Sequence, residues 1–418
     1  MQRRSFLSLF VAWGVERLVC GRRAQAAPPD PGYFWVHVQA EGGWDQTLLC
    51  DPKPNLRPGL PASERIVRHA GNLSYLSLCD FGLPEGQGFF GRYHDRLLVI
   101  NGIDTGTNNH EIGARYSSSG STNERTPCFA AQVAAVYGQT QPLAFLDYGG
   151  YDETADLIAP TRVQLGGTAV LRALIEPNSD GAEQFLRPAT AALVEEAHRR
   201  RTERLLTTLR LPGQQQALRQ LLVARAAQRD LARLPVPSGP DDLGKLIRLG
   251  LDAYQQRLAV SMNLCIRGFD SHAANEATQR DRLRALLSAV TLLVEEAERR
   301  SVPAVVLMTS DFGRTPYYTN DGTDHWPVSS AMVLVTRPAR ARGLRLPTGR
   351  TIGGTTDGGV AQALRPLRVH PRTLALDSGG VVITPGHLMR ALRRAAGIAE
   401  AEALRRFPLT VDQDLALG

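Results

Sequence analysis

The chain contains almost no lysine. Lys53 and Lys245 are the only two among 418 residues, although lysine and arginine together number 48. The formal net charge of +7 is therefore carried by arginine, and the arginines are scattered or stand in short groups such as Arg199–Arg201. A nucleic-acid-binding protein more often clusters its basic residues with aromatic side chains on one face. We therefore expect no nucleic-acid partner.

Several motifs of common site types are absent as well. No CxxC spacing occurs among the five cysteines, which argues against a thiolate metal site. There is no internal repeat, no Walker lysine and no Rossmann glycine fingerprint. The glycine-rich segment Gly353–Gly359 lacks the strand–turn–helix context of a phosphate cradle, so we interpret it as a surface or site-edge loop.

A long membrane-spanning run is also lacking near the N-terminus. The apolar run Phe6–Val15 is shorter than the roughly twenty residues that span a bilayer. Arg3 and Arg4 precede it, and a small-x-small pattern, Ala24–Ala26, follows. This combination is typical of a twin-arginine export signal cleaved near Ala26, and the alternative is an uncleaved amphipathic helix.

We therefore expect residues 1–26 to be a signal peptide and residues 27–418 to be exported to the periplasm or another extracytoplasmic compartment, without an integral membrane segment. The twin-arginine route carries folded proteins, often loaded with a cofactor, so it is suggestive of a bound metal. In an oxidising compartment the remaining cysteines permit three full pairings, and the sequence does not choose among them. These cysteines are Cys50, Cys79, Cys128 and Cys265.

Apolar runs alternate with amphipathic segments along the rest of the chain. Runs typical of buried strands are Tyr33–Gln39, Arg96–Ile100, Leu143–Leu146, Ala259–Ile266, Val305–Met308 and Ala331–Val335. Helical spacing of apolar residues predicts helices over Phe129–Tyr137, Leu243–Arg257 and Arg280–Arg299. Strands separated by crossovers of this length indicate one α/β domain, with a mostly parallel central sheet and helices on both faces.

A helical insertion interrupts this alternation at about residues 182–257. Ala189–Leu209 and Gln214–Leu231 are rich in alanine, leucine, glutamate and arginine, and Pro212-Gly213 divides them. The pattern predicts a helical hairpin inserted between elements of the sheet.

Carboxylates follow four of the apolar runs directly. These residues are Asp45, Asp104, Asp270 and Asp311. Because ligands gather outside the carboxyl ends of parallel strands, we expect these side chains at one edge of the sheet. His272 lies two residues after Asp270 and so points to the same side of an extended segment. The loop that begins at Asp311 also carries three polar residues, Arg314, Asp324 and His325.

Converging carboxylates and imidazoles predict a site for one or two divalent ions of zinc, manganese, magnesium or calcium. Two such ions roughly 4 Å apart would activate an attacking oxygen and hold an anionic ester in line. Arg314 is a candidate clamp for a phosphoryl or sulfuryl oxygen.

Each residue also has a structural interpretation. Asp45 would cap a helix at Gln46–Leu49, Asp311 and Arg314 would form a buried ion pair, and His325 would bond to backbone in a turn.

Two longer motifs carry a family resemblance. Ser310–Pro316 (SDFGRTP) followed by Gly322–His325 (GTDH) resembles the signature of an exported bacterial family known as domain-of-unknown-function family 1501. Gly268–His272 (GFDSH) and Gly42–Asp45 (GGWD) are similar to its other motifs. The resemblance covers nearly the whole mature chain. It implies the alkaline phosphatase/sulfatase fold, whose enzymes are metal-dependent hydrolases or transferases of phosphate and sulfate esters.

The resemblance also implies roles for single residues. Asp45 corresponds to a first-strand metal ligand, Asp311 to a ligand of one ion, and Asp270, His272 and His325 to ligands of another. Phe312 stands where the superfamily commonly has a ligand histidine, which weakens or removes the second metal site.

The loop that precedes His110 departs from the family as well. Asn109 stands where related members have serine, so the resemblance leaves Thr107 or a water molecule as the nucleophile. His110 remains open as a ligand, a general base or a loop histidine.

The sequence supports two hypotheses of different classes. In the first, the protein is an exported metal-dependent hydrolase that acts on an anionic small molecule or polymer. In the second, it is a degenerate relative that binds a surface polymer or a partner protein, not identified by the sequence, without catalysis. Convergence of Asp270, His272 and His325 beside an open cleft favours the enzyme, whereas closure of the site by Phe312 favours the binding protein.

Overall fold

An eight-stranded mixed sheet forms the centre of the computed structural model, which describes residues 32–163, 169–179, 183–236, 242–320, 322–358 and 362–417. Its strand order is β12-β4-β11-β8-β1-β7-β5-β6. Every neighbouring pair is parallel except those of β11, which runs antiparallel to β4 and β8. The predicted α/β class with a mostly parallel sheet is confirmed. The predicted export signal, residues 1–26, lies outside the described residues.

The sheet strands are short and mostly buried. They are β1 (Phe34–Ala40), β4 (Leu97–Asp104), β5 (Phe145–Tyr148), β6 (Pro160–Arg162), β7 (Ser261–Ile266), β8 (Ala304–Ser310), β11 (Val328–Val335) and β12 (Arg350–Gly353). All residues of β1, β8 and β11 are buried, which explains why these strands read as continuous apolar runs. Two small antiparallel pairs lie outside this sheet, and they are β2 (Val67–Ala70) with β3 (Leu73–Leu76) and β9 (Gly313–Arg314) with β10 (His325–Trp326).

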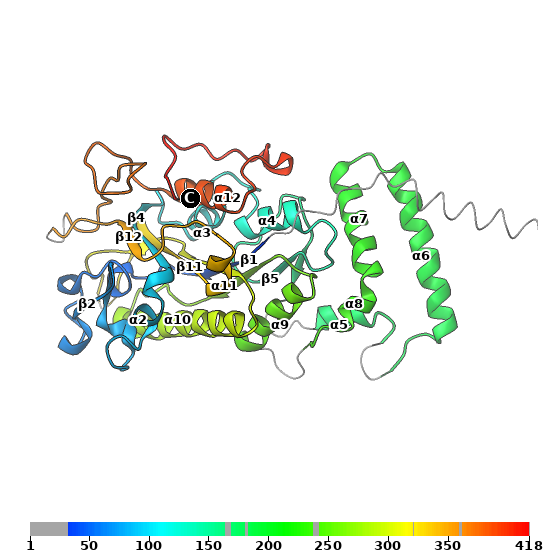
Figure 1. Cartoon of the computed structure of the whole chain (residues 1–418), viewed down its shortest axis with the longest axis horizontal. Coiled ribbons are helices and arrows are strands. Elements are labelled where there is room, and N and C mark those ends of the chain that lie inside the picture. Colours follow the sequence, from blue (N-terminus) through cyan, green and yellow to red (C-terminus); the bar gives the residue numbers. More distant parts are fainter. Residues whose placement is uncertain are drawn as a thin grey trace, which may run out of the picture. The chain divides into compact units, whose positions relative to one another are not determined.

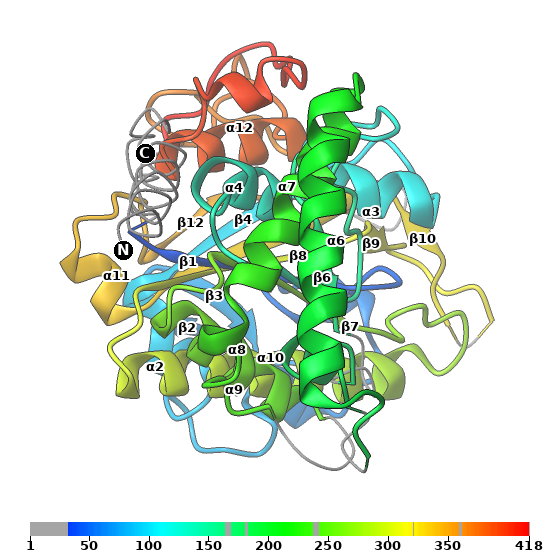
Figure 2. The same ribbon diagram turned by 90° about the vertical axis from the view of Figure 1, so that its right-hand side faces the viewer.

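Helices cover both faces of the sheet (Figures 1 and 2). One face carries α2 (Phe89–Tyr93), α9 (Leu243–Gln255) and α10 (Asn275–Arg299), and the other carries α3 (His110–Ser119), α4 (Phe129–Tyr137) and α12 (Pro385–Ala395). Alternate residues of β1 contact the two layers, because successive side chains of a strand point to opposite faces. Phe34 packs on Tyr254 of α9 at 5.0 Å between ring centroids, and Trp35 packs on Phe129 of α4 at 5.3 Å.

The expected helical insertion lies between β6 and β7. It contains α5 (Ala169–Ile175), α6 (Pro188–Thr208), α7 (Pro212–Ala226) and α8 (Gln228–Leu231). The helices α6 and α7 lie side by side and have no buried residues, and Arg225 of α7 pairs with Glu195 of α6 at 2.8 Å. By contrast, α9 is amphipathic and packs on α10, so it belongs to the helical layer of the sheet.

Within the described residues, no helix combines the length and apolar character needed to cross a bilayer. The four cysteines that follow the expected signal are all free thiols, so the structure contains none of the pairings that the sequence permits. Burial raises the pKa of three of these thiols, those of Cys50, Cys128 and Cys265, to about 12. Thiols held in the neutral form are poor nucleophiles and poor metal ligands.

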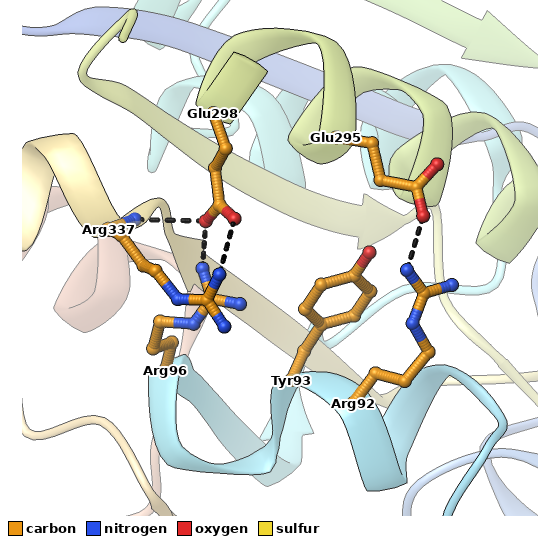
Figure 3. Close-up of a pocket in the computed structure, with 6 residues that line it drawn as sticks. All are labelled: Arg92, Tyr93, Arg96, Glu295, Glu298 and Arg337. Carbon is orange, nitrogen blue, oxygen red and sulfur yellow. Dashed lines mark hydrogen bonds and ion pairs between the residues drawn. The ribbon is translucent and has the colours of Figure 1, made fainter.

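A cavity of about 410 Å³ lies where α2 and the following η5 (His94–Arg96) meet α10 and α11 (Arg337–Ala341) (Figure 3). It is lined by Arg92, Tyr93, Arg96, Glu295, Glu298 and Arg337. Glu295 pairs with Arg92, and Glu298 pairs with both Arg96 and Arg337 (Figure 3). Each of these three guanidinium groups thus has a carboxylate partner, and the ion pairs connect elements that lie far apart in the sequence.

His37, in the middle of β1, should make the fold sensitive to acid. Its ring is fully buried, its Nε2 lies 2.8 Å from the Oγ1 of Thr309, and burial lowers its pKa to about 3. Below pH 6.5 the unfolded chain gains a proton that the folded chain does not bind, so stability falls from about pH 6.5 down to about pH 3. The loss should reach about 2 kcal/mol at pH 5.

Denaturant unfolding at pH 7 and pH 5 tests this expectation. The variant His37→Gln cannot titrate, so its loss of stability between the two pH values should be smaller than that of the unmodified protein by about 2 kcal/mol. An equal loss in both proteins would rule His37 out as the source of the acid sensitivity.

Candidate metal centre

Loops from several strands meet at the edge of the sheet where the parallel strands end. Tight packing there depends on the turn after β1, in which Gly42 and Gly43 have φ values of +114° and +85°. A Cβ on Gly43 would lie 2.6 Å from the ring of Phe312, and one on Gly42 would lie 2.5 Å from the backbone nitrogen of Asp270. The two glycines therefore let the β1 turn lie directly against the loops that follow β7 and β8.

Three imidazole rings and one carboxylate converge at this edge, and we call His110, Asp270, His272 and His325 the His/Asp cluster. The Nε2 of His272 lies 3.1 Å from the Nε2 of His325 and 3.0 Å from the Oδ1 of Asp270. The Nε2 of His325 lies 3.1 Å from the same oxygen. The Nε2 of His110 lies 3.6 Å from the Oδ2 of Asp270. The predicted convergence of Asp270, His272 and His325 is therefore present, and His110 joins it.

The opposite ring nitrogens of these histidines contact fixed protein groups. The Nδ1 of His110 lies 2.9 Å from the Oδ2 of Asp311, and the Nδ1 of His325 lies 2.8 Å from the backbone oxygen of Asn108. A carbonyl oxygen can only accept, so the Nδ1 of His325 donates and the Nε2 of the neutral ring has a free lone pair. Ligand histidines of metal sites are typically oriented in this way by a carboxylate or a carbonyl group.

Asp324 lies at the edge of the cluster. Its Oδ1 accepts a hydrogen bond from the backbone nitrogen of His325 at 2.7 Å and lies 3.8 Å from the Nδ1 of His272. Ligand-type atoms of Asp324, His272 and His325 all lie within 4.8 Å of one another, as do those of His110, Asp270 and His325. Asp324 thus has a position from which it can orient His272 or contact an ion.

The donor atoms of three cluster members, His110, Asp270 and His325, lie close enough together to hold one ion. Zinc–nitrogen bonds of about 2.0–2.1 Å place neighbouring donor atoms about 3.3–3.4 Å apart. Four donor separations in the His/Asp cluster, between 3.0 and 3.6 Å, bracket this value. Imidazole nitrogens with one carboxylate are a donor set suited to zinc.

The residue before α3 explains how His110 reaches the cluster. Asn109 caps this helix, and its side chain accepts a hydrogen bond from the backbone nitrogen of Ile112 at 3.1 Å. Asparagine caps a helix about as well as serine does. His110 is therefore the first residue of α3 and faces the strand ends. Asn109 has a structural role, although it stands where the resemblance suggested a nucleophile.

Phe312 forms the floor of the cluster and does not close it. Its side chain is fully buried, and its ring centroid lies 4.8 Å from that of His110 and 4.4 Å from that of His325. The ligand-type side chains above it remain accessible, with about two fifths to half of the surface exposed for His110 (39%), Asp270 (43%) and His272 (49%). Phe312 therefore packs beneath the cluster and does not cover it.

Arg314 is buried beneath the cluster and cannot act as the predicted substrate clamp. Its side chain is fully buried, and all three nitrogens of its guanidinium group donate to protein oxygens. Its Nη2 bonds to the Oδ1 of Asp270 at 2.7 Å and also to the carbonyl groups of Gly42 and Phe269. The structure therefore corrects this prediction, because no N–H group of Arg314 is available to a ligand. Arg314 positions Asp270 instead.

Asp45 caps a helix, which is the structural role that the sequence offered as an alternative to metal binding. It is fully buried and caps η1 (Gln46–Leu48), and its Oδ1 accepts from the backbone nitrogen of Thr47 at 3.0 Å. Its Oδ2 pairs with the Nε of Arg57 at 2.5 Å and accepts from the Nδ2 of Asn275 at 3.1 Å. Arg57 is fully buried as well. The structure thus does not bring Asp45 to the cluster, because buried donors engage both carboxylate oxygens.

Two further residues lie beside the cluster without joining it. Asp311 accepts from the backbone nitrogen of Gly42 at 2.9 Å and contacts His110, so it orients a histidine and does not pair with Arg314. Thr107 accepts from the backbone nitrogen of Asn109 at 3.1 Å through its Oγ1. No base contacts the Thr107 hydroxyl among the described residues. Asp45, suggested as a first-strand metal ligand, and Asp311, suggested as a ligand of the other ion, are not assembled into a second site.

Charge interactions adjust the pKa values of two cluster members. Partial burial opposes ionisation of Asp270, but the hydrogen bond and charge of Arg314 favour the ionised form, and the pKa of this carboxyl group is lowered below its usual value. The hydrogen bond to Asp311 raises the pKa of His110 above that of a free histidine. Asp270 is therefore charged at neutral pH, while His110 must lose a proton to bind a cation. Metal binding at this site should accordingly weaken as the pH falls.

Comparison with known proteins identifies a family for part of the chain. Residues 214–375 match the family described as "Protein of unknown function (DUF1501)". The matched segment contains the motifs at Gly268–His272 and Ser310–His325, so the resemblance is confirmed for these residues, while the motif Gly42–Asp45 lies outside the match. No curated protein matches the chain in sequence.

Solved structures with similarity to the chain are remote in sequence. The integral membrane protein lipooligosaccharide phosphoethanolamine transferase A (EptA) from Neisseria meningitidis has a TM-score of 0.34 and 9% identity, and the match covers 80% of this chain and 56% of the transferase. The alkaline phosphatase from the Antarctic bacterium TAB5 has a TM-score of 0.32 and 9% identity, covering 73% of this chain and 90% of that chain. A mutant of that phosphatase with bound magnesium has a TM-score of 0.33, 8% identity and the same coverage. The present chain thus spans less than two thirds of the length of the transferase.

The ion pair of Asp45 and Arg57 should be a major source of stability. The variant Asp45→Asn leaves Arg57 as a buried charge without a partner, so we expect a loss of about 3–5 kcal/mol in the free energy of unfolding. Denaturant unfolding measures this loss. The double variant Asp45→Asn/Arg57→Met removes both charges and should recover part of it. If Asp45→Asn instead left stability unchanged and weakened metal binding, Asp45 would be a ligand after all.

Proposed function

We propose that this chain, whose residues 214–375 match the DUF1501 family, is a metal-dependent hydrolase of phosphate or sulfate esters. The His/Asp cluster would hold one divalent ion, and zinc suits its donor set best. The observation that carries the proposal is the convergence of three imidazole Nε2 atoms on Asp270 at an accessible edge of the sheet, with the Nδ1 atoms of two rings engaged by protein groups.

The protein groups around the ion would hold the ligands in place. Arg314 keeps Asp270 ionised and in position, Asp311 orients His110, and the carbonyl of Asn108 orients His325. A divalent ion would supply the positive charge that attracts an anionic ester and polarises its oxygen. The buried ring of Phe312 excludes water from the inner side of the cluster, so a substrate approaches from the opposite, exposed side.

A second function, binding without catalysis, is favoured by the side chains around the cluster. Arg314 is fully buried and so cannot reach a phosphoryl or sulfuryl oxygen of a ligand, and Thr107 has no neighbouring base among the described residues. A protein of this class would use the bound ion to recognise an anionic polymer or the acidic group of a partner protein. Both functions use the metal centre, but only the hydrolase would convert a bound ester to product.

Metal titration tests the centre itself. We expect about one zinc ion per chain by elemental analysis, and a lower melting temperature after treatment with a chelator, because the ion binds only the folded chain. The variant Asp311→Asn should weaken zinc binding about 10–100-fold, since Asp311 orients a ligand without being one. His272→Ala should weaken it at least as much.

The matched control is His69→Ala, which removes an exposed histidine from the β2–β3 hairpin and should leave zinc affinity unchanged. Absence of bound metal together with an unchanged melting temperature in chelator would refute the metal centre.

Turnover distinguishes the two functions. The zinc-loaded protein should hydrolyse a chromogenic phosphate or sulfate monoester, and Asp270→Asn should lose this activity together with the metal. If the loaded protein binds a phosphate or sulfate ester and releases no product, the binding function replaces the hydrolase.

We also propose that the chain is exported by the twin-arginine route. The supporting pattern is Arg3-Arg4 before a short apolar run and Ala24–Ala26 after it. The mature protein from a bacterial periplasm should begin at Ala27, and replacement of Arg3 and Arg4 by lysine should retain the precursor in the cytoplasm. N-terminal sequencing and fractionation measure both outcomes, and export of the doubly substituted chain would contradict this route.

A further inference from the structure

Four arginines are buried in the described part of the chain, and one of them differs from the other three. Arg57 pairs with Asp45, Arg96 with Glu298, and Arg314 with Asp270. The fourth, Arg393 of α12, is only 5% exposed and has no carboxylate partner among the described residues. A buried charge is normally paired, so Arg393 is the exception that needs a physical explanation.

The neighbours of Arg393 satisfy only part of its guanidinium group. Its Nε donates to the Oε1 of Gln132 at 2.7 Å, and its Nη1 donates to the carbonyl of Phe407 at 2.7 Å. Its Nη2 is buried and has no hydrogen-bond partner in the described part of the chain. Burial and the nearby charge of Arg390 lower the pKa of Arg393 to about 10, and no acidic group counteracts this shift. The side chain thus remains charged at neutral pH, and its immediate contacts include no counter-ion.

A cavity of about 300 Å³ adjoins this side chain. Its charged lining residues are Arg390, Arg393, Arg394, Glu400, Arg405 and Asp414. Asp414 pairs with both Arg390 and Arg394, whereas the exposed Arg405 has no ion pair with a described residue. Four arginines against two carboxylates leave the cavity with an excess of two positive charges.

The position of these residues on the helix does not account for Arg393. Basic side chains in the last turn of a helix interact favourably with its negative end, and Arg393 and Arg394 both have such a position. This interaction favours the charge of Arg393, but it supplies no acceptor for the buried Nη2, which has no hydrogen-bond partner in the described part of the chain. In the cavity of Figure 3, by contrast, each of the three arginines has an ion pair with Glu295 or Glu298.

We propose that the cavity beside Arg393 is a binding site for a divalent oxyanion, namely inorganic phosphate or the phosphate group of a small ester. Arg393 lines the cavity and would bind one oxygen through its unpartnered Nη2, which has to turn from its buried position toward the ligand, and the exposed Arg405 would donate to another oxygen. A phosphate group fits better than a single carboxylate, because it matches the excess charge of two and offers more than two acceptor oxygens to donors on separate elements. The site has no residue in common with the His/Asp cluster.

Calorimetric titration of the full chain with inorganic phosphate tests the proposal. Sodium chloride at the same ionic strength serves as the reference, and the protein is kept metal-free so that the His/Asp cluster contributes no phosphate binding. We expect one phosphate per chain. Arg405→Gln should weaken binding by about tenfold, because it removes one charge-assisted hydrogen bond from an exposed residue. Arg393→Gln should abolish measurable binding.

Two variants serve as controls. Arg406→Gln removes the neighbouring charge, whose side chain donates to the carbonyl of Ala155 and does not line the cavity, and it should leave phosphate affinity unchanged. His325→Ala disables the metal centre and should also leave it unchanged. The inference is overturned if Arg405→Gln binds phosphate as tightly as the unmodified chain, if phosphate has no more effect than chloride, or if His325→Ala removes the binding. Because Arg405 is exposed, its variant gives an answer even if Arg393→Gln does not fold. Failure of the hydrolase proposal would leave these results unchanged.

Discussion

The arrangement of the metal centre depends on one buried cation, the guanidinium group of Arg314. Its planar fork offers donors in fixed directions, and the structure uses them to hold carbonyl oxygens of the β1 turn and of the loop after β7. The same group bonds to Asp270, which lies at the middle of the His/Asp cluster. A lysine has one nitrogen at the end of a flexible stem, so it could not connect these segments in the same way. The carboxylate of the cluster is thus positioned by a charge that a substrate does not contact.

Much of the fold could be predicted from the sequence, because the central strands are buried on both faces. β1, β8 and β11 therefore appear as uninterrupted apolar runs. The edge strands β6 and β12 are short and partly exposed, and for this reason they have no comparable signal. The start of α10 at Asn275 was missed, since its first turns are polar. Asn275 and Gln279 are buried there by hydrogen bonds to the loops around Asp45, which no local pattern reveals.

The sequence predicts only some of the residues that form the site. Shared strand ends correctly indicated that Asp270, His272 and His325 converge. The role of each carboxylate, however, depends on partners that are distant in sequence. Asp45 is engaged by Arg57 and Asp311 by His110, whereas Asp270 faces the open side of the sheet. Phe312 illustrates the same limit, because its residue type excludes coordination but does not predict that it supports two histidine rings from below.

In the central sheet only β11 runs antiparallel to its neighbours, and this determines where the length of the chain can change. Because β11 lies beside β8 and runs in the opposite direction, the segment between them leaves and rejoins the sheet at neighbouring points. This segment carries Asp311 at one end and His325 near the other. Lengthening a loop whose ends are already held together costs only about 0.6 kcal/mol per doubling. Residues inserted between these two positions should therefore reshape the surface around the cluster at small cost, because the strands that anchor the segment need not move.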